Sequence, residues 1–112
     1  MPDAGWTHVD DVEADTFDDR RSADLIGTDE IPTTSGFNVG VAWYTAEEFG
    51  EPQVHDDQEA VYVVSGEGEL RVGDDVVSLT PGTAVYVPPG TAHGGRRTTD
   101  EPVVVVYTHG AV

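Results

Sequence analysis

The chain has 112 residues, which suffice for one domain with one hydrophobic core. It contains no cysteine, so disulfides and thiolate chemistry are excluded and any metal site must use nitrogen and oxygen ligands. Twenty-two acidic residues against five arginines and no lysine give a net charge of −17, which disfavours nucleic acid and anionic membranes as partners.

The first part of the chain, residues 1–35, is acidic and weakly patterned. It neither resembles a secretory signal nor contains an apolar run long enough to cross a membrane, so we expect a cytoplasmic protein. Its scattered apolar residues are compatible with an edge strand or a short helix. The turn-rich stretch 31–36 then separates this N-terminal segment from a predicted barrel over residues 36–112.

The stretch 37–44 has the period-two alternation of a half-buried strand. Phe37, Val39, Val41 and Trp43 share one parity, which predicts that they lie on one face of a sheet. Residues 45–48 are compatible with one helical turn, which Gly50 and Pro52 would end.

Short strands are predicted along the rest of the chain. They cover residues 53–55, 60–65, 69–72, 76–79, 84–87 and 103–109, with turns rich in glycine, proline and aspartate between them. Short strands separated by frequent turn signals are typical of a β-sandwich or a β-barrel. The sequence therefore predicts a single all-β domain.

Three polar residues share the parity of the buried valines that follow them. Gln53, His55 and Glu59 can project to the same face as Val61 and Val63, toward the interior of a barrel. A buried carboxylate is costly unless it is paired or binds a cation. His93 follows the turn of residues 88–90, which can bring it over the barrel mouth. Two imidazoles and one carboxylate suit Fe, Mn, Ni or Zn.

Two segments resemble the motifs of the cupin family. Residues 82–97 (GTAVYVPPGTAHGGRR) are similar to the second cupin motif, G-x5-P-x-G-x2-H-x3-N, with matches at Gly82, Pro88, Gly90 and His93 and with Arg97 in place of the final asparagine. Residues 50–66 (GEPQVHDDQEAVYVVSG) resemble the first motif. There Glu59 and Gly66 fix the register, which puts His55 at the second histidine position and Gln53 at the first.

The resemblance implies a cupin jelly-roll barrel that holds one divalent metal ion (Fe, Mn, Ni or Zn) through Gln53, His55, Glu59 and His93. Members of the family typically use three histidines and one glutamate. The amide oxygen of Gln53 is a weaker, harder ligand than an imidazole nitrogen. Gln53 can also lie behind the ligands or face the substrate. His55 and Asp57 could instead be the His-x-His pair of the first motif, but only one residue would then separate that pair from Glu59, which is too few for the motif.

The resemblance also implies a function, a metal-dependent enzyme of dioxygenase or isomerase type that acts on a small organic molecule. The alternatives are a non-catalytic module that binds or senses a small molecule and a scaffold that only dimerises. Arg97, Tyr62, Tyr107 and His109 are candidate substrate-binding residues. His109 shares the parity of Tyr107 on the last strand, which favours a core or rim position. Cupins of this size usually pair, so we expect a homodimer.

The composition resembles that of proteins from halophiles that accumulate salt, as in haloarchaea, because acidic residues are abundant and lysine is absent. At about 1 M salt the Debye length falls to roughly 3 Å, which screens most of the repulsion between surface carboxylates.

Overall fold

In the computed structural model, which describes residues 3–110, the chain forms nine strands and one short 3₁₀ turn, η1 (Val9–Asp11). The prediction of an all-β chain is therefore confirmed. Within the described residues, no helix is long and apolar enough to cross a membrane. The strands are β1 (Asp15–Thr16), β2 (Arg20–Ile26), β3 (Asn38–Tyr44), β4 (Gln58–Ser65), β5 (Gly68–Val72), β6 (Asp75–Leu79), β7 (Ala84–Val87), β8 (His93–Arg97) and β9 (Val103–Gly110).

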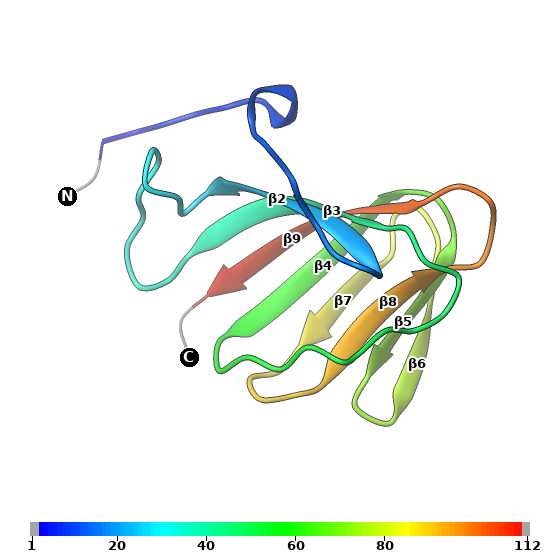
Figure 1. The fold of residues 1–112 in the computed structure, drawn as a ribbon. Helices are drawn as coiled ribbons and strands as arrows, with labels where there is room; N and C mark the ends of the chain where they lie inside the picture. Colours follow the sequence, from blue (N-terminus) through cyan, green and yellow to red (C-terminus); the bar gives the residue numbers. More distant parts are fainter. Residues whose placement is uncertain (1–2, 111–112) are drawn as a thin grey trace.

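The strands form two antiparallel sheets (Figure 1). The larger sheet has the order β1-β2-β3-β9-β4-β7, and the smaller has the order β6-β5-β8. The last strand, β9, is inserted between β3 and β4, as expected for a jelly roll. β1 and β2 belong to residues 1–35, so this segment joins the larger sheet and its hydrogen bonds to β3 cross the predicted boundary at residue 35.

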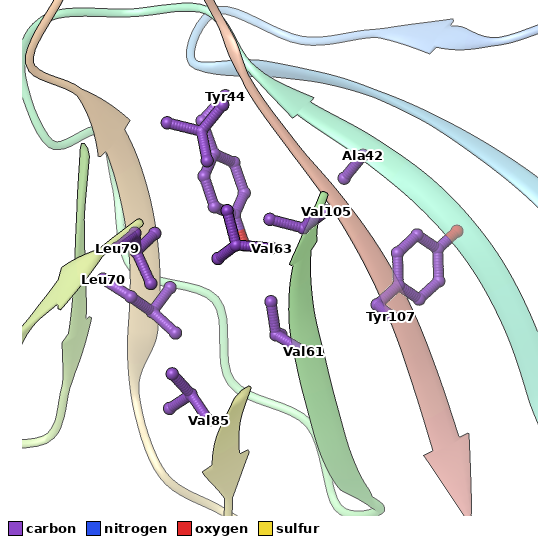
Figure 2. Close-up of a cluster of buried hydrophobic side chains, with 10 residues drawn as sticks. Ala42, Tyr44, Val61, Val63, Leu70, Leu79, Val85, Val105 and Tyr107 are labelled. Atoms are coloured by element: carbon purple, nitrogen blue, oxygen red, sulfur yellow. The ribbon is translucent and has the colours of Figure 1, made fainter. Parts of the chain in front are cut away.

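The core consists of side chains that the two sheets direct toward each other (Figure 2). Val63, Leu70 and Val105 are completely buried, and they come from β4, β5 and β9. Burial alternates along β4 and β9, as expected for strands with one face in a core. Full burial of such a side chain contributes about 1.5–3 kcal/mol to folding.

Three details of the predicted secondary structure were wrong. Residues 53–55 form no strand, since only Gln53 pairs, in an isolated bridge with His93. Residues 45–48 form no helical turn. β8 was missed because its sequence, HGGRR, has no apolar alternation.

The alternation over β3 was predicted correctly, but the more buried face carries the small and aromatic residues Gly40, Ala42 and Tyr44. Small residues are needed on this face because the tyrosine rings of the core lie across it. An added Cβ on Gly40 would lie 2.2 Å from the phenol oxygen of Tyr107.

Charge repulsion should make the stability of this fold depend on salt. Only three of the 22 carboxylates form ion pairs with arginine within the described residues, namely Asp19, Glu47 and Glu69. We expect the thermal unfolding midpoint to rise steadily between 0.15 and 2 M KCl, because salt screens the remaining repulsion. Circular dichroism melts at several KCl concentrations test this, and a midpoint that is independent of KCl would contradict it.

Candidate metal centre

The register of the larger sheet places Glu59 opposite His109. They are cross-strand partners in β4 and β9, and both project toward the barrel interior. The side chains of such partners lie close together without any loop to position them. Nε2 of His109 accordingly lies 3.1 Å from Oε1 of Glu59, whose carboxylate is buried.

Two further histidines approach the same oxygen atom. His55, in the connection between β3 and β4, places its Nε2 2.9 Å from Oε1 of Glu59. His93 begins β8, is held by two backbone hydrogen bonds to Gln53, and places its Nε2 3.2 Å from that oxygen. Three imidazole nitrogens therefore converge on one carboxylate oxygen.

The other ring nitrogen of each histidine faces an oxygen acceptor. Nδ1 of His55 lies 3.1 Å from the carbonyl oxygen of Asp57, and Nδ1 of His109 lies 3.2 Å from Oδ2 of the Asp57 carboxylate. Nδ1 of His93 lies 2.9 Å from the carbonyl oxygen of Thr91. Acceptors in these positions keep the proton on Nδ1 and aim the Nε2 lone pair at the centre, as in metal-binding histidines.

This arrangement fits a divalent metal ion. Three Nε2 lone pairs that face a carboxylate repel it unless protons or a cation lie between them. The ligand atoms of His55, Glu59 and His109 all lie within 4.8 Å of one another, as a shared ion requires. His93 lies outside this group and joins the site through the 3.2 Å contact of its Nε2 with Oε1 of Glu59. Three imidazoles and one carboxylate suit Fe, Mn, Ni or Zn.

The site also shifts the pKa values of its members. Burial alone would raise the pKa of Glu59, but hydrogen bonds from His109 and His93 outweigh it and lower the pKa to about 2. Burial opposes the charged form of His93, yet its hydrogen bond to Glu59 raises its pKa above the ordinary value. The hydrogen bond to Glu59 also raises the pKa of His109. Without metal, these imidazoles therefore bind protons readily.

A cavity of about 210 Å³ opens beside these residues. Pockets for drug-sized ligands have about 300–1,000 Å³, so this cavity admits only a small ligand. Its wall consists of Asp15, Phe17, Arg20, Ser22, Asp24, Ala42, Tyr44, Gln53, Glu59, His93, Gly94, Tyr107 and His109. Tyr107 reaches over Gly40 and donates a hydrogen bond to Asp24, two strands away. Burial and this bond raise the pKa of Tyr107, so its phenol stays protonated.

The structure brings most of the predicted site residues together. Gln53, Glu59, His93, Tyr107 and His109 line the cavity, and His55 contacts Glu59 and stacks on His109 at a ring-centroid distance of 4.6 Å.

Two of the predicted substrate contacts lie elsewhere. Tyr62 is 51% exposed and pairs with Val106 on the opposite face of the sheet. The guanidinium of Arg97 donates to the carbonyl oxygens of Thr45 and Thr99. Neither side chain lines the cavity. Alternation on β4 turns Tyr62 to the outer face, and Arg97 lies four residues beyond His93, at the other end of β8.

Sequence reasoning did not assign Arg20, Asp24 and Tyr44 to the site, nor Asp57 to its place behind His55 and His109. The even parity of Arg20 and Asp24 along β2 is a signal for a shared face. It identifies the interior only after the pairing of β2 with β3 is known.

Comparison with known proteins agrees with this architecture. Residues 44–109, more than half of the chain, match the sequence profile of the cupin domain. The chain belongs to the cupin family. The chain is also similar to the protein named H2HPP isomerase from Bacillus subtilis, to which it is 37% identical over 57 residues. That match covers 50% of this chain and only 24% of the relative's length.

Solved structures show the same fold. An RmlC-like cupin from Shewanella frigidimarina superposes with a TM-score of 0.77 at 19% identity, over 99% of this cupin and 94% of that chain. The polyketide cyclase RemF from Streptomyces resistomycificus gives a TM-score of 0.78 at 19% identity, over 97% of this cupin and 80% of that chain. At such identities the likeness establishes the fold alone.

Proposed function

We propose that this cupin is a metal-dependent enzyme, of isomerase or dioxygenase type, that acts on a small organic molecule. The observation that carries the proposal is the convergence of three imidazole nitrogens on Oε1 of Glu59 beside a cavity. The match to an isomerase-named protein supports the choice of reaction class, although it spans a small part of that relative. A non-catalytic small-molecule-binding module is the alternative function.

His109 takes the place of the imidazole that is absent at Gln53. Its Nε2 lies at the same carboxylate oxygen as those of His55 and His93. The three imidazoles and Glu59 would hold the metal, while Gln53 stays in the cavity wall, where its amide can contact the metal or a substrate. A third histidine from β9 thus restores the donor set typical of the family.

The chain supplies groups for proton movement next to this site. A bound divalent metal would polarise a substrate oxygen and favour loss of a neighbouring proton. Asp24 is an acceptor for such a proton, since Tyr107 donates to one of its oxygens and holds the carboxylate toward the cavity. The phenol of Tyr107 has a single proton, so it can donate to a substrate oxygen only in place of its bond to Asp24.

Elemental analysis and reconstitution test the proposal. Protein purified in KCl without chelators should contain about one Fe, Mn, Ni or Zn per chain, and a chelator-treated sample should take up one equivalent. The His55→Ala variant should take up none, whereas His8→Ala, which changes an exposed histidine that does not line the cavity, should behave as wild type. Absence of metal uptake would refute the proposal. Uptake without turnover of any small-molecule substrate would favour the binding module.

Metal affinity should depend on pH. His93 and His109 must lose a proton to bind metal, and their pKa values lie above the ordinary 6.5. Affinity should therefore fall on acidification, beginning above pH 6.5, and up to two protons should be released per ion. Calorimetric titrations with zinc between pH 5.5 and 8.5, in two buffers of different ionisation enthalpy, measure the affinity and the number of protons released. An affinity that is constant over this range would contradict the expectation.

A homodimer through the outer face of the larger sheet is also proposed. Val41, Val106 and Tyr62 are successive cross-strand neighbours on β3, β9 and β4, and this row carries no charged residue. Two copies of a chain with charge −17 can meet there without bringing carboxylates together. Sedimentation should show a dimer in KCl, and Val106→Asp should give a monomer that still binds metal. A monomeric wild-type protein would contradict the proposal.

A further inference from the structure

Arg20 brings a guanidinium group to the wall of the metal-site cavity. It lies on the inner face of β2, opposite Tyr44 of β3, and lines the cavity together with Glu59 and His93. Its side chain is only 21% exposed. Nothing in the motifs of the sequence points to this residue, because it precedes the matched region, residues 44–109.

The neighbours of Arg20 fix its position but leave hydrogen-bond donors free. Nη1 donates to Oδ1 of Asp19 at 2.9 Å, and the guanidinium lies 4.1 Å from the centre of the Phe17 ring. Arginine has five N–H donors, and within residues 3–110 Nε and Nη2 of Arg20 have no hydrogen-bond partner. An oxygen ligand in the cavity can satisfy these donors.

The other four arginines are engaged outside the cavity. Arg21 stacks on Trp43, and Arg71 stacks on Phe49. Arg96 pairs with Glu69, and Arg97 binds backbone carbonyl oxygens. Among the described residues that line the cavity, Arg20 is therefore the only arginine or lysine.

The surroundings of Arg20 favour a ligand with a single negative charge. Asp15 and Asp24 also line the cavity and would repel a dianion such as phosphate more strongly than a monoanion. The planar fork of a guanidinium matches a carboxylate. Phe17, which is 46% exposed, offers an apolar wall for the carbon skeleton of a small ligand.

We propose that Arg20 binds the carboxylate of a small organic acid, which makes such monocarboxylates the substrate class of this cupin. The carboxylate lies against Arg20 and Phe17, while another part of the ligand faces Glu59 and the three histidines. The assignment of this ligand as a substrate rests on the proposed metal-dependent function. The carboxylate contact itself does not need the metal, because the chain alone forms it.

Benzoate and its neutral analogue benzamide are suitable probes. Isothermal titration in KCl should show tighter binding of benzoate than of benzamide to the zinc-loaded wild-type protein. Arg20→Gln should weaken benzoate binding by about ten- to a hundredfold and leave benzamide unaffected, as expected for loss of a charge-assisted hydrogen bond. The adjacent Arg21→Gln, on the opposite face of β2, is the matched control and should bind benzoate as wild type. Inorganic phosphate should bind more weakly than benzoate.

Two control measurements accompany the titrations, circular dichroism and metal analysis. Circular dichroism verifies folding, and if Arg20→Gln does not fold, Arg20→Lys, which keeps the charge but not the fork, should still lose benzoate affinity relative to Arg21→Lys. Metal content is measured in every sample. If Arg20→Gln loses the preference for benzoate but the wild-type protein takes up no metal, the carboxylate site is upheld and the metal function is refuted. Equal binding of benzoate and benzamide, or equal effects of the Arg20 and Arg21 changes, would overturn this inference even if metal is bound.

Discussion

Replacing His109 with alanine is expected to lower the metal affinity of this cupin by more than a hundredfold. The side chain places Nε2 3.1 Å from Oε1 of Glu59, at the point where the other two imidazoles meet. Loss of a residue behind a ligand typically costs 10–100-fold in affinity, so loss of a ligand should cost more. Titration with Co(II), followed by its visible absorption and by calorimetry, measures this effect.

Gln53→Ala is the matched comparison, because Gln53 lines the same cavity and occupies the first histidine position of the motif. It should change the affinity by less than His109→Ala, since an amide oxygen is the weaker ligand. The reverse order would show that the motif position, rather than β9, supplies the fourth ligand.

Gly40→Ala should destabilise the protein by about 1–3 kcal/mol or more, as expected for an overpacked interior. The added Cβ would lie 2.2 Å from Cζ of Tyr107 and 2.7 Å from the carbonyl oxygen of Ala23. The ring would have to move, and its hydrogen bond to Asp24 would be lost. Urea unfolding in KCl measures the change in the free energy of unfolding.

Gly94→Ala is the control for this substitution. Gly94 lines the same cavity, yet an added Cβ there has no neighbour within 4 Å, and its backbone is not left-handed. Its free energy of unfolding should stay within about 0.5 kcal/mol of wild type. Equal effects of the two substitutions would mean that Tyr107 does not lie across Gly40.

Local patterns in the sequence predicted the fold class and most strands. The alternation in β4 and β9 is strong, because valines fill one face of each strand, and glycine-rich turns mark their ends. β8 could not be predicted in this way. Gly95 leaves room for the Tyr44 ring, which lies 2.3 Å from the position of an added Cβ on this glycine. That requirement comes from a strand of the other sheet, and local sequence contains no sign of it.

The candidate site was predicted in part for a similar reason. The motifs brought His55, Glu59 and His93 together, because their spacing within short segments is enough to identify them. His109 was predicted to contact substrate, and its approach to Glu59 depends on the pairing of β4 with β9 across 50 residues of sequence. Arg20 depends likewise on the pairing of β2 with β3. Site residues that only the register of the sheet brings together can be identified only from the structure.

The most direct test of the metal centre is a crystal structure of the metal-loaded protein with anomalous scattering recorded at the metal's absorption edge. We expect one anomalous peak about 2.0–2.2 Å from Nε2 of His55, His93 and His109 and from a carboxylate oxygen of Glu59, as for zinc or a similar ion. A peak that Gln53 contacts and His109 does not would contradict the assignment of the third imidazole. No peak among these residues, in protein soaked with excess metal, would contradict the metal centre itself.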